Sequence, residues 1–239
     1  MRIFLAGATG AIGRPLTRLL VAAGHAVTGT TRFAEKAAEI AAAGATPEIL
    51  DAYDGDAVRV AVMAARPDVV IHQLTDLPAI RDPATYPSAL LANAQLRIVA
   101  TPNLAVAARA AGARRFIAQS VAFAYAPSAA PYRETDPLDF AAEGTRADLV
   151  RGVVALEAVT LGTPGLDGIV LRYGMLHGPG TWYAAAAGPG SLHVDTAAHA
   201  ALLALTQGRP GIYNVAEDDG AVSIAKAREH LGFDPASPL

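Results

Sequence analysis

Cysteine is absent from this 239-residue chain, and charge of either sign is scarce. Without thiols the chain forms no disulfides and offers no thiolate ligands to a metal. Lys and Arg together number 19 and form no basic run, so we expect no nucleic-acid partner. The six histidines show none of the close pairing of a zinc-protease helix. We therefore expect no metal site.

Long apolar runs are also missing. No run reaches the roughly 18 residues that a membrane span requires, and residues 1–7 lack the charged and apolar regions of a signal peptide. These absences predict a cytoplasmic protein without membrane contact. The chain is nevertheless 52% hydrophobic and only 17% charged, which excludes a disordered chain and supplies enough apolar residues for one large domain.

Short apolar segments rich in β-branched residues alternate with alanine-rich stretches of helical length. The expected strands are 2–6, 26–30, 48–50, 68–72, 115–119, 168–172 and 211–215. The expected helices are 12–23, 34–43, 55–65, one that ends near 111–112, 143–161, 195–206 and 223–231. This alternation predicts the α/β class, with a Rossmann-type doubly wound parallel sheet. We predict a single domain over 1–239, in which 174–239 form a small C-terminal substrate lobe.

The first expected strand runs directly into LAGATGAIGR, residues 5–14. Gly7, Gly10 and Gly13 recur there at three-residue spacing between a strand and a helix, which is the context of a dinucleotide-binding loop. Gly7 permits a tight turn, Gly10 lets backbone approach a pyrophosphate, and Gly13 lets the helix pack close to the strand. The free N–H groups of the helix start favour phosphate. We therefore predict a bound dinucleotide.

The end of the second expected strand bears on which dinucleotide is bound. An NAD site places an acid about 20 residues beyond the glycines, where it binds the ribose 2′-hydroxyl. Here Thr31 and Arg32 occupy that place, and the first acid is Glu35. Arg32 suits the 2′-phosphate of NADP, with Arg14 as a second candidate contact. We expect NADP, with NAD as the alternative; the other interpretation of Arg32 is a solvated surface residue.

Further segments resemble an extended or atypical short-chain dehydrogenase/reductase of the NAD-dependent epimerase/dehydratase group. They are GATGAIG at 7–13, ILDAYD at 49–54, VVIHQLT at 69–75, NAQLRIVATPNLAVAARAAGARRFIAQS at 93–120, PYRETDPL at 131–138, VLRYGMLHGPG at 170–180, HVDTAAHAALLAL at 193–205 and GIYNVAEDDG at 211–220. Their order and spacing together are more specific than any one segment. The resemblance implies an NAD(P)-dependent oxidoreductase or epimerase/dehydratase-like enzyme for a small carbonyl- or hydroxyl-bearing substrate. It also implies a homodimer through the two long helices.

The resemblance implies a set of cofactor contacts at the ends of the strands. They are Gly7, Thr9, Gly10, Ala11, Ile12, Gly13, Arg14, Arg32, Asp51, Ala52, Gln73, Leu74, Thr75, Asn93, Gln119, Tyr173, Gly174 and Met175. Asp51 and Ala52 are expected at the adenine, 73–75 beside a ribose, and 173–175 near the nicotinamide. Asp51 also has a purely structural interpretation, as a cap after the strand.

The family's catalytic pair is missing from this chain. Relatives use Tyr-x-x-x-Lys on the fifth helix, where the tyrosine acts as general acid or base. If Glu157 aligns with the glutamate that commonly follows the pair, Leu149 and Val153 take the places of the tyrosine and the lysine. The only lysines, Lys36 and Lys226, have no tyrosine four residues before them.

Two hydroxyls are the catalytic candidates that remain. Ser120 lies one residue before the position expected for the family's serine, and Tyr125 is a substitute acid. Tyr173, His177 and Tyr183 are weaker substitutes. An intact binding loop without the catalytic pair leaves two functions open. One is an enzyme that uses a substitute donor or water, and the other is a catalytically inactive NADP-binding sensor or regulatory protein.

Overall fold

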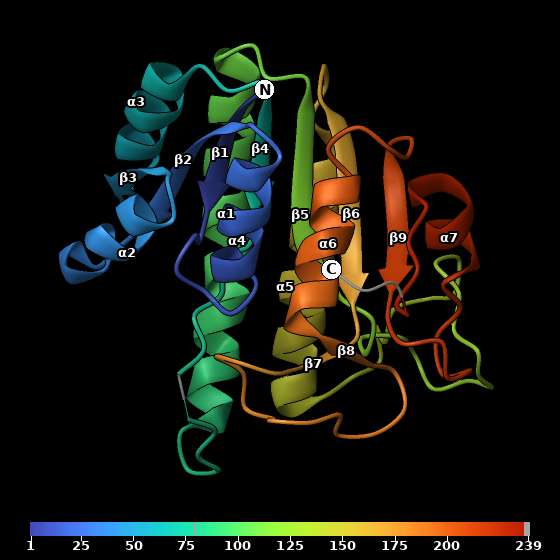
Figure 1. The fold of residues 1–239 in the computed structure, drawn as a ribbon. Helices are drawn as coiled ribbons and strands as arrows, with labels where there is room; N and C mark the ends of the chain where they lie inside the picture. Colours follow the sequence, from blue (N-terminus) through green and yellow to red (C-terminus); the bar gives the residue numbers. More distant parts are fainter. Residues whose placement is uncertain (79, 237–239) are drawn as a thin grey trace.

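A computed structural model describes residues 1–78 and 80–236 of the chain. Within them a parallel sheet has the strand order β3-β2-β1-β4-β5-β6-β9 (Figure 1). Its strands are β1 (Arg2–Ala6), β2 (Ala26–Thr31), β3 (Thr46–Ile49), β4 (Val69–His72), β5 (Arg115–Val121), β6 (Asp167–Tyr173) and β9 (Gly211–Val215). The order reverses between β1 and β4, as in a doubly wound Rossmann-type fold. The predicted fold class is confirmed.

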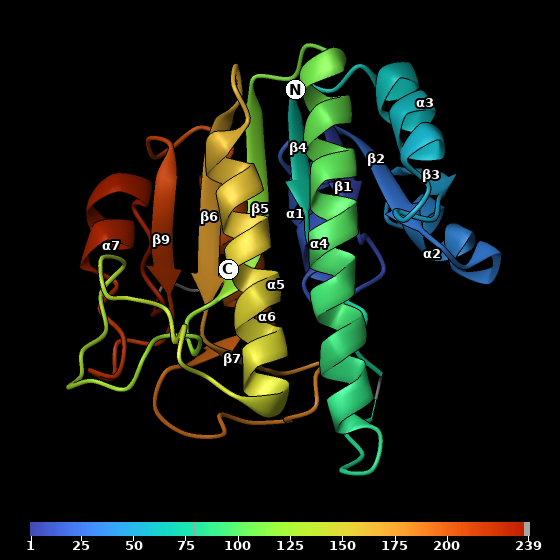
Figure 2. The same cartoon turned by 180° about the vertical axis from the view of Figure 1, so that it is seen from behind.

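Helices cover both faces of the sheet. On one face lie α1 (Gly13–Ala22) and α6 (Val194–Leu203), in front of the sheet in Figure 1. On the other face lie α3 (Gly55–Ala65), α4 (Tyr86–Ala110) and α5 (Gly144–Gly162), in front in Figure 2. The short η1 (Ala34–Lys36) and α2 (Ala37–Ala42) precede the edge strand β3, and α7 (Ala225–Leu231) packs beside β9.

The alternation of side chains along each strand explains why the strands are apolar throughout. Ile3 and Leu5 of β1 belong to the core cluster under α1 and α6, whereas Phe4 and Ala6 belong to the cluster under α3, α4 and α5. Because successive side chains point to opposite faces and both faces are covered, no position on β1 after Arg2 reaches solvent.

Residues 174–236 are largely built onto the sheet. Strand β9 pairs with β6, and α6 packs against α1. What lies beyond the main sheet is the small parallel pair β7 (Met175–His177) and β8 (Ser191–His193), with the loop that joins them. This loop crosses the lower edge of the molecule in Figure 1. Neither strand was predicted from the sequence, because three residues are too short for a recognisable period.

The structure also divides one predicted helix. The stretch expected as a helix over 34–43 is a 3-10 turn followed by the six-residue α2. In the part of the chain that the structure describes, we find no helix that combines the length and the apolar character needed to cross a bilayer.

Candidate active site

The glycine loop lies at the carboxyl end of β1, beside the point where the strand order reverses. Hydrogen bonds fasten it to β2: the Gly7 N–H donates to Thr30 Oγ1 at 3.2 Å, and the Ala8 N–H donates to the Thr30 carbonyl at 3.1 Å. The Thr9 hydroxyl lies 3.4 Å from that of Thr31. In doubly wound sheets the crevice at this point is where ligands bind.

The glycines of the loop are required by close backbone packing. A Cβ on Gly13 would lie 2.0 Å from the Gly7 carbonyl oxygen, and one on Gly10 would lie 3.3 Å from the same atom. Gly7 has a φ of +92°, and a Cβ there would lie 2.9 Å from the Gln73 carbonyl oxygen. No side chain caps the start of α1 at Ile12. The cradle therefore offers backbone N–H groups and the positive helix end, which suits a pyrophosphate.

Arg32 follows β2 and is half exposed. Its guanidinium pairs with Asp76 at 2.8 Å, and the exposed side-chain fractions are 49% and 25%. Arg14 is paired with Glu39. Asp76 and Glu39 were not predicted from the sequence, because neither carboxylate is at a fixed spacing from its arginine. Both arginines lie beside the loop, where a 2′-phosphate would compete with their carboxylate partners.

The ends of β3 and β4 carry the other residues expected at the adenosine. Asp51 Oδ1 accepts the Tyr53 N–H at 3.0 Å, so Asp51 does cap the turn after β3. The Ala52 carbonyl accepts Asn103 Nδ2 at 3.0 Å. Burial, and then the nearby Asp76, raise the pKa of the partly exposed Tyr53. Tyr53 is a further polar group at this end of the site, one that sequence reasoning did not single out.

Gln73, directly after β4, is buried and reaches across to the end of β6. Its Nε2 donates to the Tyr173 hydroxyl at 3.3 Å, while its Oε1 is buried and has no hydrogen-bond partner among the residues that the structure describes. Burial raises the pKa of Tyr173, so the hydroxyl keeps its proton. An unpaired acceptor at this edge fits a ligand that donates a hydrogen bond, as a nicotinamide dinucleotide can through its ribose hydroxyls or amide.

Other predicted contacts occupy the same edge. Asn93 Oδ1 accepts the Asp76 N–H at 2.9 Å, and the Leu74 N–H donates to His72 Nδ1 at 3.2 Å. Thr75 is exposed, and Gln119 is buried at the end of β5. A Cβ on Gly174 would lie 2.2 Å from the Gly190 carbonyl oxygen, so only glycine fits at this close approach of the two backbones. Gly174 joins the end of β6 to Met175, the first residue of β7.

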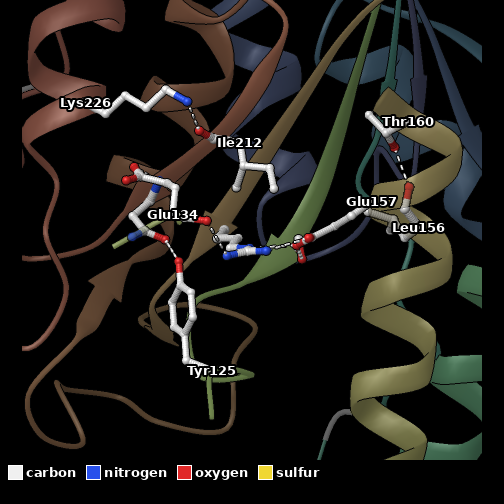
Figure 3. Close-up of polar contacts among 10 residues, drawn as sticks. Tyr125, Glu134, Leu156, Glu157, Thr160, Ile212 and Lys226 are labelled. Carbon is white, nitrogen blue, oxygen red and sulfur yellow. Dashed lines mark hydrogen bonds and ion pairs between the residues drawn. The ribbon is translucent and has the colours of Figure 1, made fainter. Parts of the chain in front are cut away.

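Ser120 is fully buried and already paired. Its hydroxyl donates to Glu157 Oε1 at 2.7 Å, and Arg172 of β6 holds both oxygens of Glu157 at 2.8 and 2.6 Å. Figure 3 shows Glu157 reaching from α5 toward the sheet. Burial disfavours the charge of Arg172, but the hydrogen bonds that Arg172 donates to Glu157, together with the charge of that carboxylate, outweigh it and raise the pKa of Arg172.

Tyr125 is buried beside this pair. Its hydroxyl donates to Asn214 Oδ1 at 2.6 Å, the bond drawn from Tyr125 in Figure 3. Its ring stacks on Tyr132 with the centroids 5.2 Å apart. The Arg172 guanidinium lies 4.9 Å from the ring centroid, and burial raises the pKa of Tyr125. Both candidate hydroxyls, Ser120 and Tyr125, thus have internal partners. The catalytic roles expected of them stay predictions.

The α5 positions expected to align with the family's pair hold apolar side chains against the core. Val153 is fully buried, and Leu149 is partly buried against the same cluster. Neither can donate or accept a proton. Over residues 1–78 and 80–236 no group of three or more metal-ligating side chains comes together.

Comparison with known proteins decides the family. The profile of the NAD dependent epimerase/dehydratase family matches residues 3–186. The chain belongs to that family. A Streptomyces protein, the 3-diazoavenalumate denitrifying reductase, is 42% identical over an alignment of 242 residues that covers 92% of this chain and 77% of that protein.

Solved structures share the fold of this family member. A UDP-glucose 4-epimerase of Thermotoga maritima with UDP-glucose superposes with a TM-score of 0.79 at 19% identity and covers 100% of this chain and 94% of that one. The Bordetella bronchiseptica enzyme WbmG in complex with NAD and UDP gives 0.75 at 20% identity, with 100% and 90% covered. Family and reductase relative together support an NAD(P)-dependent oxidoreductase or epimerase-like activity, which confirms the coarse functional prediction.

Proposed function

We propose that this family member is an NADPH-dependent reductase that delivers hydride to a small molecule. The observation that carries the proposal is the identity of 42% to a protein named as a reductase, over 92% of the chain. The glycine cradle supports it, because backbone packing leaves the start of α1 free for a pyrophosphate. The bound nicotinamide would supply the hydride, and the chain's part is to orient it.

The preference for NADP rests on Arg32. A half-exposed guanidinium at the end of β2 can turn from Asp76 to a 2′-phosphate, which offers a stronger charge-assisted contact than one carboxylate oxygen. The acid that an NAD site needs at this strand end is absent, since the first one, Glu35, already lies in η1. Arg14 is placed to assist from the first turn of α1.

For the substrate, we favour an organic anion that carries an aromatic diazo group in its diazonium form over a carbonyl compound. Reduction of a carbonyl needs a hydride and a proton, and the Tyr-x-x-x-Lys pair that usually provides the proton is absent from this sequence. When a diazonium compound accepts hydride, the hydride electron pair forms the C–H bond. The C–N electron pair then leaves with N₂. No proton is consumed, so a site with Leu149 and Val153 suffices.

The test is a comparison of acceptors. Purified protein with NADPH is given either 3-diazoavenalumate, the compound named for the Streptomyces relative, or a panel of small aldehydes and ketones. We expect NADPH oxidation with one equivalent of released N₂ for the diazo compound and no oxidation above background for the panel. Oxidation driven by a carbonyl compound alone would overturn the substrate assignment and restore the carbonyl reductase.

A catalytically inactive NADP-binding sensor is the second candidate. It is favoured by one observation: the hydroxyls of Ser120 and Tyr125 both donate to acceptors inside the protein. The same experiment separates the two. A sensor binds NADPH, seen as a change in nicotinamide fluorescence, and leaves it unoxidised with every acceptor.

A further inference from the structure

Two buried side-chain atoms without a hydrogen-bond partner lie on either side of the end of β4. Within the described residues they are Gln73 Oε1, an acceptor, and Arg97 Nε, a donor. Gln73 directly follows β4, and the charge of Arg97 on α4 acts on His72, the last residue of β4. Buried polar atoms are nearly always paired, so the unpartnered Arg97 donor indicates that an acceptor is missing beside the end of β4.

Arg97 is also a buried charge without an ion pair. It is 3% exposed, and no carboxylate of the described residues lies within ion-pair distance of it. Burial lowers the pKa of Arg97 to about 10, which nearby Glu157 only partly offsets. The guanidinium therefore stays charged at neutral pH, in surroundings that disfavour its charge.

The neighbouring acceptors are all used by other donors. Glu157 takes its hydrogen bonds from Ser120 and Arg172, so Arg97, Arg172 and Glu157 leave one net positive charge. Asn93 Oδ1 is held by a backbone N–H, and so is His72 Nδ1. The remaining nitrogen of His72 faces the hydroxyl of Thr101, which itself donates to the Arg97 carbonyl.

Two charge interactions place Arg97 near the end of β4 and α5: its charge acts on His72, the last residue of β4, and Glu157 of α5 acts on Arg97. A Cβ on Gly152 of α5 would lie 2.7 Å from Ala94 Cα, so the two helices touch one turn from Arg97 and one residue from Val153. A long helical side chain leans toward the N-terminus of its helix, which for Arg97 is the carboxyl edge of the sheet. Glu157, on which Arg97 acts, lies about one helical turn after Val153, the residue expected in place of the family's lysine.

We propose that Arg97 binds an anionic oxygen of the substrate at this edge, as the cation that the α5 helix no longer supplies. The inference deepens the proposed function, because a substrate that carries a carboxylate or phenolate is then held beside the nicotinamide. The ligand completes the hydrogen bonding of the guanidinium and neutralises the cluster. Retaining an unpaired buried charge costs stability, so its removal should favour the empty protein and impair the loaded one.

The experiment compares the wild type with Arg97→Met and Arg97→Lys. Binding of two probes is measured by calorimetry with and without NADP⁺: cinnamate, charged only at its carboxylate, and 4-nitrophenolate, charged only at its phenolate. We expect at least one probe to bind about tenfold more weakly to Arg97→Met, the loss of one charge-assisted hydrogen bond. Arg97→Lys should recover part of that loss. The probe affected identifies the oxygen.

Thermal unfolding of the same proteins provides the second readout. We expect the empty Arg97→Met variant to unfold at or above the wild-type temperature, and NADP⁺ alone to raise both midpoints equally. Unchanged probe affinity in Arg97→Met overturns the inference, whatever its unfolding temperature. If NADP⁺ fails to stabilise the wild type, the proposed function fails instead, and the probes on the empty proteins still decide the role of Arg97. Arg97→Gln replaces Arg97→Met should the latter not fold.

Discussion

Two regions of the same sheet edge are built in opposite ways. At the ends of β1 and β2 the chain offers mostly backbone: glycines packed against each other, an uncapped helix start and a half-exposed Arg32. At the ends of β5 and β6 the polar side chains bind one another, as Ser120, Glu157 and Arg172 do. The first region is open to a ligand, and the second is closed on itself.

The difference teaches that binding and proton transfer are separable in this fold. The nucleotide cradle depends on backbone geometry, which a few glycines maintain. The acid of the family depends on two side chains on α5, and Leu149 and the fully buried Val153 take their places if Glu157 aligns with the glutamate that follows the pair. The fold of the family is thus kept in a sequence without a Tyr-x-x-x-Lys pair.

Breaking the closed region should have the largest effect. Glu157→Gln leaves Arg172 charged and nearly fully buried without its anion, and we expect a loss of about 3–5 kcal/mol in the free energy of unfolding. The matched control is Glu39→Gln, whose ion pair with Arg14 is exposed and should contribute under about 1 kcal/mol. Urea unfolding measures both. Equal losses would mean that the Glu157 pair adds no more than a surface contact.

Filling the cradle should have the next largest effect. A methyl group at Gly13 collides with the Gly7 carbonyl, so Gly13→Ala should cost about 1–3 kcal/mol and abolish NADPH binding. Gly162→Ala is the control, because a Cβ there meets no atom within 4 Å and φ is not in the left-handed region. Fluorescence titration with NADPH follows binding. Wild-type affinity in Gly13→Ala would show that the loop does not hold the phosphates.

The pH dependence of stability should report the protonation of His72, the buried last residue of β4. Burial, and then the charge of Arg97, lower the pKa of His72 from 6.5 to about 3. Below pH 6.5 the unfolded chain therefore binds a proton at His72, whereas the folded protein leaves His72 neutral. Stability is therefore fully present above that pH and falls as the pH falls, by about 2 kcal/mol between neutrality and about pH 5. Urea unfolding over this range should show the slope. In His72→Gln the slope should shrink, and an unchanged slope would place the titration elsewhere.

A substitution of Arg32 tests which dinucleotide the open region binds. Arg32→Ala should weaken NADPH binding about tenfold or more and leave NADH binding nearly unchanged, because only NADPH carries the 2′-phosphate. Arg151→Ala, which removes an exposed arginine of α5, should change neither affinity. Equal weakening of both dinucleotides by Arg32→Ala would rule out the 2′-phosphate contact.

The smallest effects should come from the two hydroxyls. Ser120→Ala and Tyr125→Phe each remove one buried hydrogen bond and should cost about 1 kcal/mol of stability. Turnover of the diazo substrate should stay within about threefold of wild type, whereas loss of a general acid removes about 10²–10⁴. A loss of that size in either variant would reinstate its hydroxyl as the catalytic acid.

The sequence predicted the sheet well because its signals are local. Apolar runs such as 115–119 and glycine stops such as Gly24 lie within a few residues of the elements they define. The cradle was predictable for the same reason. The pairs Arg172–Glu157 and Tyr125–Asn214 join residues from different elements, and no sequence spacing predicts either pair. The one available signal was Arg172 itself, a charge inside an apolar strand that requires a buried partner.

The most direct test of the account is the origin of the new hydrogen in the product. The protein is given 3-diazoavenalumate in ordinary water with NADPH that is deuterated at the transferred position of nicotinamide C4. The mass of the product is then measured by mass spectrometry. We expect one deuterium on the carbon that carried the diazo group. With unlabelled NADPH in deuterated water, we expect no deuterium on that carbon. Product without cofactor deuterium would contradict direct hydride delivery and with it the account of a reductase that needs no protein acid.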